Sequence, residues 1–229
     1  MSIWICKKGR RLRTATAFLG LSLAAACTDG AGGFGFLQPA PEKVVVAGKS
    51  VVIAGPPGYC VDTTATRDST TGAFVLLGSC ASIANTAVAR APTTPGMLTA
   101  SVSGTSGSAI SASLGQLEAF FTSEAGRAAL ARDGRASSVR ILQTRRKGQA
   151  FYIHVRDKSE NAIQGLSQDY WRGLFDVQGR IVTVSVVGFD HKPMSDATGL
   201  ATLNAFAARI RTENSRLSDG TAPTEPAAL

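Results

Sequence analysis

The most regular alternation of apolar and polar residues lies in the C-terminal third of the chain. Residues 168–177 and 180–187 alternate on either side of Gln178-Gly179, a pair suited to a tight two-residue turn. This pattern predicts a β-hairpin. Strand alternation places Tyr170 and Trp171 on opposite faces, so one of them should meet solvent or a packed helix. Core packing is the simpler expectation, whereas an exposed aromatic would indicate a ligand or partner surface.

A second hairpin is predicted just before the first. Residues 139–144 and 149–156 flank Arg145-Arg146-Lys147-Gly148, which would form a basic hairpin tip. In the second arm one face carries Phe151, Ile153 and Val155, and the other carries Tyr152, His154 and Arg156. The latter face is polar, so His154 is expected to border solvent.

Two segments show the three- and four-residue apolar spacing of a helix. The first runs from Ser113 to Arg132, with a capping box formed by Ser113 and Gln116 and a stop at Gly134. The second is capped by Ser195 and continues to about Asn214. Two hairpins between two amphipathic helices predict an α+β fold: a mainly antiparallel sheet with helices packed on it.

Shorter apolar runs precede these elements. Residues 44–46 and 51–53 predict one bent strand or a hairpin. Residues 59–62 follow a Gly-Pro turn and lead into a polar loop that ends at Gly72. Residues 73–77 and 97–103 predict two further strands.

The first 26 residues have the pattern of an export signal. Five basic residues and no acidic ones lie within the first 13 positions, and an uncharged apolar run follows to Ala26. A run of about 10–12 residues is too short to span a bilayer, which needs about 20. We therefore expect residues 1–26 to be a signal peptide that is removed.

The end of this run, Leu23-Ala24-Ala25-Ala26-Cys27, resembles the lipobox of bacterial lipoproteins. The resemblance implies cleavage before Cys27 and lipidation of that residue, which would anchor the chain to a membrane. Ala24 departs from the pattern, which usually has Leu three residues before the cysteine, and a plain secretory signal with a chance cysteine is the alternative. Thr28 follows in place of the Asp that favours inner-membrane retention in enterobacteria, so the outer membrane is slightly favoured.

The anchor divides the chain into expected regions. Residues 27–42 are rich in Gly, Ala and Pro and predict a lipidated flexible tether. Residues 43–214 are expected to form a single globular domain. Residues 215–229 are polar with two prolines and predict a disordered tail. The expected location is the cell envelope, facing the periplasm.

The basic charge of the whole chain is misleading. The formal net charge is +8, but five of the 24 basic residues and none of the 16 acidic ones precede Cys27, which leaves a net charge of +3. A charge this small argues against a nucleic-acid partner. The Arg145-Arg146-Lys147 cluster is more simply a solvated turn than a binding patch.

Four cysteines have different expected fates. Cys6 lies in the signal and Cys27 at the lipid site, which leaves Cys60 and Cys80. In an oxidising compartment this pair most simply forms a disulfide; two free thiols or a metal pair are the alternatives. Their spacing fits no redox or zinc motif, so no metal or cofactor is expected.

Candidate chemistry is sparse. No serine lies in a Gly-x-Ser-x-Gly elbow, and the best loop candidate is His191 beside Asp190. The leading hypothesis is a non-catalytic binding or accessory domain for an envelope protein or cell-wall component. The alternative is a small exported hydrolase that uses His191 and Asp190.

Two resemblances add to this picture. Residues 58–62 and 73–80, with the later strand at 179–184, resemble a group of uncharacterised envelope lipoproteins of alphaproteobacteria, which brings no assigned activity. The strand Gly179-Arg180-Ile181-Val182-Thr183-Val184 before a last helix is also similar to the Mog1/PsbP-like domains, which implies an α/β/α sandwich.

Overall fold

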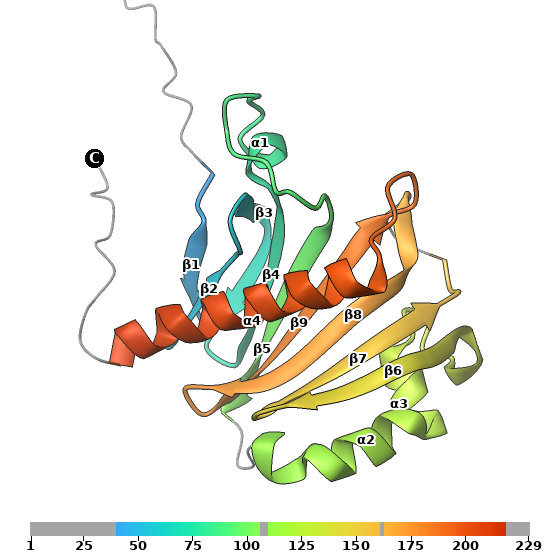
Figure 1. Cartoon of the computed structure of the whole chain (residues 1–229). Helices are drawn as coiled ribbons and strands as arrows, with labels where there is room; N and C mark the ends of the chain where they lie inside the picture. The colour runs from blue at the N-terminus through green and yellow to red at the C-terminus, as the bar shows by residue number, and fades with distance from the viewer. Residues whose placement is uncertain (1–39, 106–109, 161–162, 219–229) are drawn as a thin grey trace, which may run out of the picture. The chain divides into compact units, whose positions relative to one another are not determined.

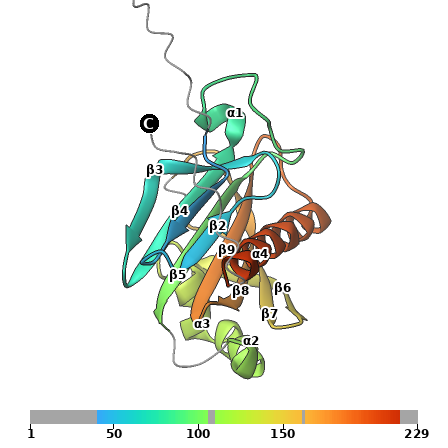
Figure 2. The same cartoon turned by 90° about the vertical axis from the view of Figure 1, so that its left-hand side faces the viewer.

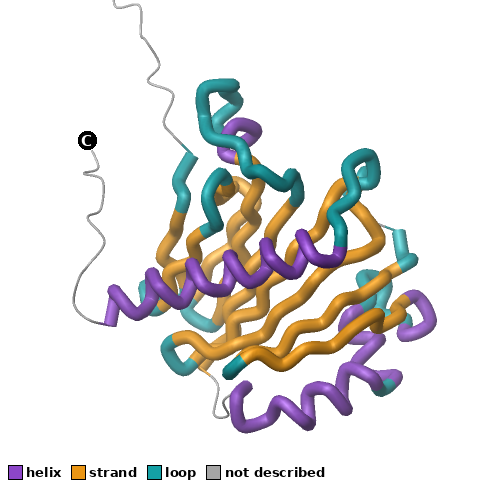
Figure 3. The backbone as a smooth tube through the Cα atoms, viewed as in Figure 1, coloured by secondary structure: helices purple, strands orange, loops and turns teal. Residues whose placement is uncertain are grey.

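The computed structural model describes residues 40–105, 110–160 and 163–218. In these ranges the chain forms a seven-stranded antiparallel sheet, a separate two-stranded hairpin and helices on both sides of the large sheet (Figures 1 and 3). The predicted α+β class and antiparallel sheet are confirmed. The elements are β1 (Lys43–Val46), β2 (Val51–Ala54), β3 (Tyr59–Ser69), β4 (Gly72–Ser79), α1 (Cys80–Ile83), β5 (Met97–Thr105), η1 (Ile110–Ser113), α2 (Leu114–Thr122), α3 (Glu124–Leu130), η2 (Ala136–Ser138), β6 (Val139–Lys147), β7 (Ala150–Asp157), β8 (Leu166–Val177), β9 (Arg180–Phe189) and α4 (Asp196–Ser218).

The strand order of the large sheet is β3-β4-β5-β9-β8-β7-β6. The last strand in sequence, β9, therefore lies at the centre, between β5 and β8. The β8–β9 hairpin is as predicted, because Gln178 and Gly179 both take positive φ angles, 50° and 68°, as its tight turn requires.

The β6–β7 hairpin differs from the prediction at its tip. Lys147 pairs with Ala150, so the turn is Gly148-Gln149 and the basic residues Arg145 to Lys147 belong to strand β6. Gly148 has a φ of 56°, which allows a turn of two residues and lets the ladder continue through the basic cluster.

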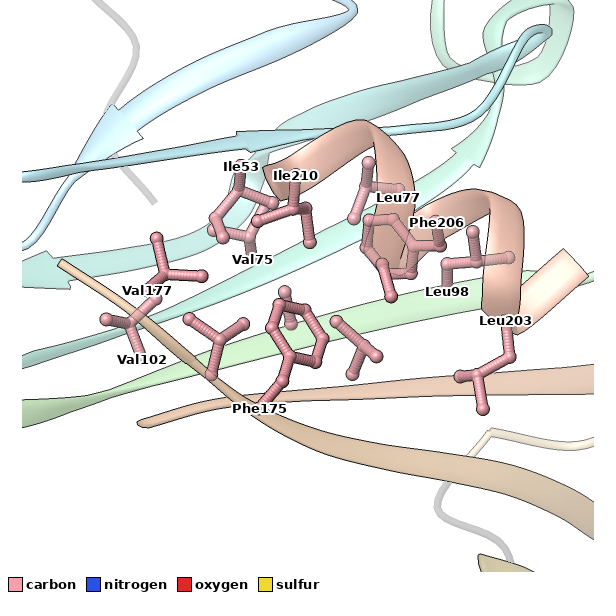
Figure 4. Packing of buried hydrophobic residues seen from close by; sticks show 14 of the residues in the cluster. Ile53, Val75, Leu77, Leu98, Val102, Phe175, Val177, Leu203, Phe206 and Ile210 are labelled. Atoms are coloured by element: carbon pink, nitrogen blue, oxygen red, sulfur yellow. The ribbon is translucent and has the colours of Figure 1, made fainter. Parts of the chain in front are cut away.

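Helix α4 lies across one face of the sheet (Figure 3). Leu203, Phe206 and Ile210 on this helix are fully buried against Ile53 of β2 and the facing side chains of β4, β5 and β8 (Figure 4). This cluster forms the larger core of the domain. Burial of this apolar face holds the helix, the β1–β2 hairpin and the sheet together.

The predicted helix 113–132 is broken, and this part of the prediction is wrong. The chain ends α2 at Thr122, and Ser123 is extended and accepts a hydrogen bond from Gly126 N at 3.2 Å to start α3. Gly126 packs so closely on α2 that an added Cβ would lie 2.0 Å from Phe120 O. The capping box is also wrong, because the Ser113 side chain makes no capping hydrogen bond. The apolar spacing continues through the break between α2 and α3, so the sequence pattern did not reveal that break.

The face opposite α4 is covered unevenly. Helices α2 and α3 lie at the β6–β7 end of the sheet (Figures 1 and 2), and Phe121 and Leu130 pack there against Phe151, Ile153 and Val155 of β7. Farther along, the side chains on this face remain exposed or half-exposed. We call this region the open half of the sheet, and it comprises Phe74 and Leu76 of β4, Thr99 and Ser101 of β5, and Thr183 and Ser185 of β9.

Two N-terminal expectations are resolved. Residues 43–54 form a hairpin, one of the two predicted alternatives. The predicted polar loop to Gly72 is wrong, because β3 continues to Ser69 and pairs with β4 on both sides of an irregularity between Asp62 and Arg67. Asp62 Oδ1 accepts hydrogen bonds from Thr64 N and Oγ1, which stabilise this bulge and allow a polar segment to remain a strand.

The predicted disulfide between Cys60 and Cys80 is present. It joins β3 to the first residue of α1 and so fixes this short helix at one end of the sheet. Cys80 N also donates to Gly58 O at 2.9 Å. The bridge therefore reinforces a contact that the backbone already makes.

The two ends of the described chain can be compared with the predicted tether and tail. Helix α4 continues to Ser218, four residues into the predicted tail, and the rest of that tail lies outside the described residues. The predicted signal peptide, Cys27 and nearly all of the tether lie outside them as well. Within the described ranges, no helix is long and apolar enough to cross a membrane.

Candidate functional site

The register of the sheet aligns side chains on the face opposite α4 in two neighbouring rows. The first row crosses four strands through Leu76, Thr99, Ser185 and Arg172, which pair in turn. The second row contains Met97, Val187 and Tyr170. All point away from α4, because the residues before and after them on their strands belong to the core beneath α4 or border it.

Two arginines meet at the edge of these rows. Arg172 of β8 and Arg132, which follows α3, place their guanidinium carbons 5.2 and 5.6 Å from the centre of the Tyr170 ring. Both distances allow a cation–π interaction. The buried aromatic ring thus brings together two cations that are 40 residues apart in sequence.

Buried groups hold this arrangement in place. Tyr170 donates from its hydroxyl to Leu130 O at 2.9 Å, which fixes the end of α3 above β8. Asp157 is fully buried and accepts a hydrogen bond from Arg132 N at 3.0 Å. Its other oxygen accepts from Ser159 N and Oγ. Burial raises the pKa of the Tyr170 phenol, so the ring remains neutral between the two cations.

Both guanidinium groups keep unused donors. Arg172 Nε donates to Ser185 Oγ at 3.2 Å, its only side-chain hydrogen bond to any described residue. Arg132 Nη1 lies 3.7 Å from Asp157 Oδ2, beyond hydrogen-bond distance, and its side chain is 28% exposed. A guanidinium carries five N–H donors, so most of those on both arginines have no partner within residues 40–105, 110–160 and 163–218.

The arginines border a cavity of about 160 Å³, which Thr99, Ser185, Met97 and Leu166 also line. Met97 and Leu166 also line a second, larger cavity of about 390 Å³. The larger cavity is mainly apolar, with Leu76, Ile83, Pro92, Pro95 and Phe189 among its lining residues. The two cavities adjoin the same two side chains, and we call the pair the groove, with an apolar section and a section that carries both arginines.

The disulfide shapes the far end of the apolar section. Cys80 begins α1, and Ile83 on this helix lies over Gly78, where an added Cβ would be 3.5 Å from the Ile83 side chain. Asp62 also borders this end, and hydrogen bonds from Thr64 lower the pKa of its carboxyl. The groove therefore has a carboxylate near one end and two guanidinium groups at the other.

The structure places the residues suggested for hydrolysis on the surface. His191 and Asp190 are both exposed, and the His191 ring stacks on Phe189 with 5.5 Å between ring centres. Among the described residues, neither a serine nor a carboxylate is hydrogen-bonded to His191. In the same part of the chain, no three His, Cys, Asp or Glu side chains gather as a metal site.

The predicted surroundings of His154 are wrong. This residue is 3% exposed, and its ring stacks on Trp171 with centres 4.6 Å apart. The first turn of α4 covers it, with Asp196 Oδ1 3.6 Å from Nε2. Burial lowers the pKa of His154, and this effect is larger than the opposite effect of the Asp196 carboxylate. The prediction failed because α4 covers this face of the sheet. The alternation of residues along β7 does not show that a helix packs there.

The two aromatics and the basic cluster also have defined places. Tyr170 and Trp171 are buried on opposite faces of β8, Tyr170 under α3 and Trp171 under α4 at Gly199. Both side chains therefore pack in the core, which was the simpler of the two expectations. In the basic cluster, Arg146 pairs with Glu118, and Lys147 contacts Asn204. The three basic side chains are exposed on β6 and not in a turn.

Sequence reasoning missed Arg132 and Arg172. Arg132 was only the last residue of the predicted first helix, and Arg172 lay within the predicted strand 168–177 without an assigned role. One signal was available, because Arg172 is a lone charge within the apolar run from Tyr170 to Phe175. A charge at such a position needs a partner or a solvent-filled cavity.

Comparison with protein-family models, with curated proteins and with solved structures gives no match to this chain.

Proposed function

We propose that this protein is a membrane-anchored lipoprotein of the cell envelope whose domain binds a ligand in the groove on the open half of the sheet. The signal-like first 26 residues and Cys27 support the anchor. The observation that carries the binding role is the groove itself, which joins an apolar section to two arginines with free donors. Small-molecule sites combine an apolar lining with a few placed polar groups in this way.

A binding role accounts for the chemistry of the groove better than a catalytic one. In the section that carries the arginines, the polar groups are two guanidinium groups, the Tyr170 phenol and the hydroxyls of Thr99 and Ser185. Arginine stays protonated, and the raised pKa of Tyr170 keeps the phenol protonated as well. These groups donate hydrogen bonds and neutralise charge, and none of them is an activated nucleophile or base.

The anchor is tested by labelling with palmitate. The wild-type chain, expressed in a bacterium, is expected to incorporate label and to fractionate with membranes, and Cys27→Ser is expected to do neither. Cys6→Ser is the matched control and should behave as wild type. A labelled, membrane-bound Cys27→Ser protein would overturn the anchor.

The binding face is tested with a photo-crosslinking residue in place of Ser101, which is exposed on the open half. The same residue in place of Ala208, exposed on α4, is the control. The expected result is a reproducible adduct of defined mass at position 101 and none at position 208. Equal adducts at both positions, or none at position 101, would count against the open half as the binding face.

A further inference from the structure

We propose that the groove binds an amphiphilic anion, a molecule with an alkyl chain that ends in a carboxylate or phosphate. The alkyl chain would lie in the apolar section, and the charged group would contact Arg132 and Arg172. This inference rests on the proposed binding function and adds the chemical class of the ligand.

The first argument is the adjacency of the two sections. Met97 and Leu166 line both of them, so an apolar cavity lies directly beside the arginines. The apolar section, about 390 Å³, is within the range of about 300–1,000 Å³ that is common for small-molecule sites. Its lining side chains can bury an alkyl chain and present few hydrogen-bonding groups.

The second argument is the hydrogen-bonding capacity of the arginines. Among the described residues, the carboxylate that pairs with Arg132 is Asp157, which is buried and already accepts hydrogen bonds from Arg132 N and Ser159. Both arginines line the cavity, and most of their guanidinium N–H groups have no acceptor in the part of the chain that the structure describes. Carboxylates and phosphates accept paired hydrogen bonds from guanidinium groups, which a neutral head group cannot match in strength.

The third argument is the polarity of the groove. Asp62 lies at the apolar end, and Thr64 lowers the pKa of its carboxyl, so a negative charge is present there. An anionic head group is repelled from that end and attracted to the arginines. The charges therefore specify the direction in which an amphiphile lies, with its alkyl end toward Asp62 and α1.

The test uses membranes that contain the full-length chain and a photoactivatable fatty acid of twelve carbons. After irradiation, mass spectrometry is expected to find label on peptides that contain Leu76, Met97 or Phe189. Competition with laurate, dodecyl phosphate and dodecanol follows. Laurate or dodecyl phosphate should reduce labelling, and the stronger of the two identifies a carboxylate or a phosphate ligand. Competition by dodecanol at the same strength would overturn the role of the arginines.

Variants make the test specific. Arg172→Gln and Arg132→Gln are each expected to weaken competition by the preferred anion about tenfold or more, the effect of losing a charge-assisted hydrogen bond. Arg211→Gln is the matched control, because Arg211 also lies over an aromatic ring, that of Phe175, but on the α4 side. Formation of the Cys60–Cys80 disulfide in each variant reports folding. Unchanged competition in a folded Arg172→Gln protein would refute the proposal.

The outcome is distinguishable from failure of the binding function. An adduct at position 101 without fatty-acid labelling of the groove would keep the open half as a binding face and reject this ligand class. Labelling that is confined to the α4 side would reject the groove as the site.

Discussion

Asn214 pairs with both backbone groups of Val52. Its Oδ1 accepts a hydrogen bond from Val52 N at 2.9 Å, and its Nδ2 donates to Val52 O at 2.7 Å. Both residues are buried. A helix side chain thus does for β2 what a neighbouring strand would do, and it fixes the β1–β2 hairpin to α4.

Replacement of Asn214 should therefore be costly. Asn214→Ala leaves the buried N–H and C=O of Val52 without this partner, and each unsatisfied group costs about 1–3 kcal/mol. We expect a loss of about 2–4 kcal/mol in the free energy of unfolding, measured by urea denaturation. Asn204→Ala, at a half-exposed position on the same helix, should cost less than about 1 kcal/mol. Equal losses in the two variants would contradict the special role of Asn214.

The junction of α2 and α3 depends on glycine at position 126. In Gly126→Ala the new methyl group would overlap Phe120 O, so the two helices must separate. We expect destabilisation of about 1–3 kcal/mol, measured as a lower thermal midpoint. Gly115→Ala in α2 meets nothing within 4 Å and should be neutral or slightly stabilising, because alanine favours helix. A neutral Gly126→Ala would show that the junction is looser than described.

Acid should weaken the fold through His154. Burial lowers the pKa of this group in the folded state below its usual value of 6.5, so the unfolded chain binds the proton more readily. The stabilising contribution is present above the unfolded pKa and is lost as the pH falls from 6.5 toward the lower folded pKa. Asp196 and Asp169 oppose this effect, and Arg156 supports it.

Thermal melting from pH 8 to pH 5 measures this dependence. The wild type should lose stability over the window below pH 6.5, and His154→Gln should show a smaller loss over the same range. His191→Gln removes an exposed histidine and should keep the wild-type dependence. If His154→Gln and the wild type lose stability in parallel, another group causes the effect.

Reduction of the disulfide should destabilise the domain. The bridge closes a loop of 20 residues, for which a loss of about 3 kcal/mol is typical. Cys60→Ser with Cys80→Ser is expected to lower the free energy of unfolding by about that amount. Digestion without reductant should yield one linked peptide pair. Separate peptides that react with an alkylating agent would show that the cysteines are free.

Features that depend on residues close together in the chain could be predicted from the sequence. The turn at Gln178-Gly179 and the alternation around it specify the β8–β9 hairpin without other information. The spacing of Leu203 and Ile210 likewise specifies the buried face of α4. The break at Ser123 was not predictable, because it depends on the close packing of Gly126 on α2. The burial of His154 depends on the placement of α4, which is decided elsewhere in the chain.

The groove was beyond prediction for the same reason. It brings together Leu76, Thr99, Ser185 and Arg172 from four strands, and their alignment requires the strand order and register of the whole sheet. Arg132 joins them through a hydrogen bond of Tyr170 to Leu130. No local pattern carries that information.

The central position of β9 determines when the domain can be completed. Strands β3 to β5 and strands β6 to β8 each form their own ladder, but β5 and β8 share only β9 as a neighbour. A chain that ends before Arg180 would therefore hold two partial sheets with unpaired edges, which are prone to join with other chains. Synthesis from the N-terminus delivers this strand after β3 to β8, so folding of the whole sheet must wait for it.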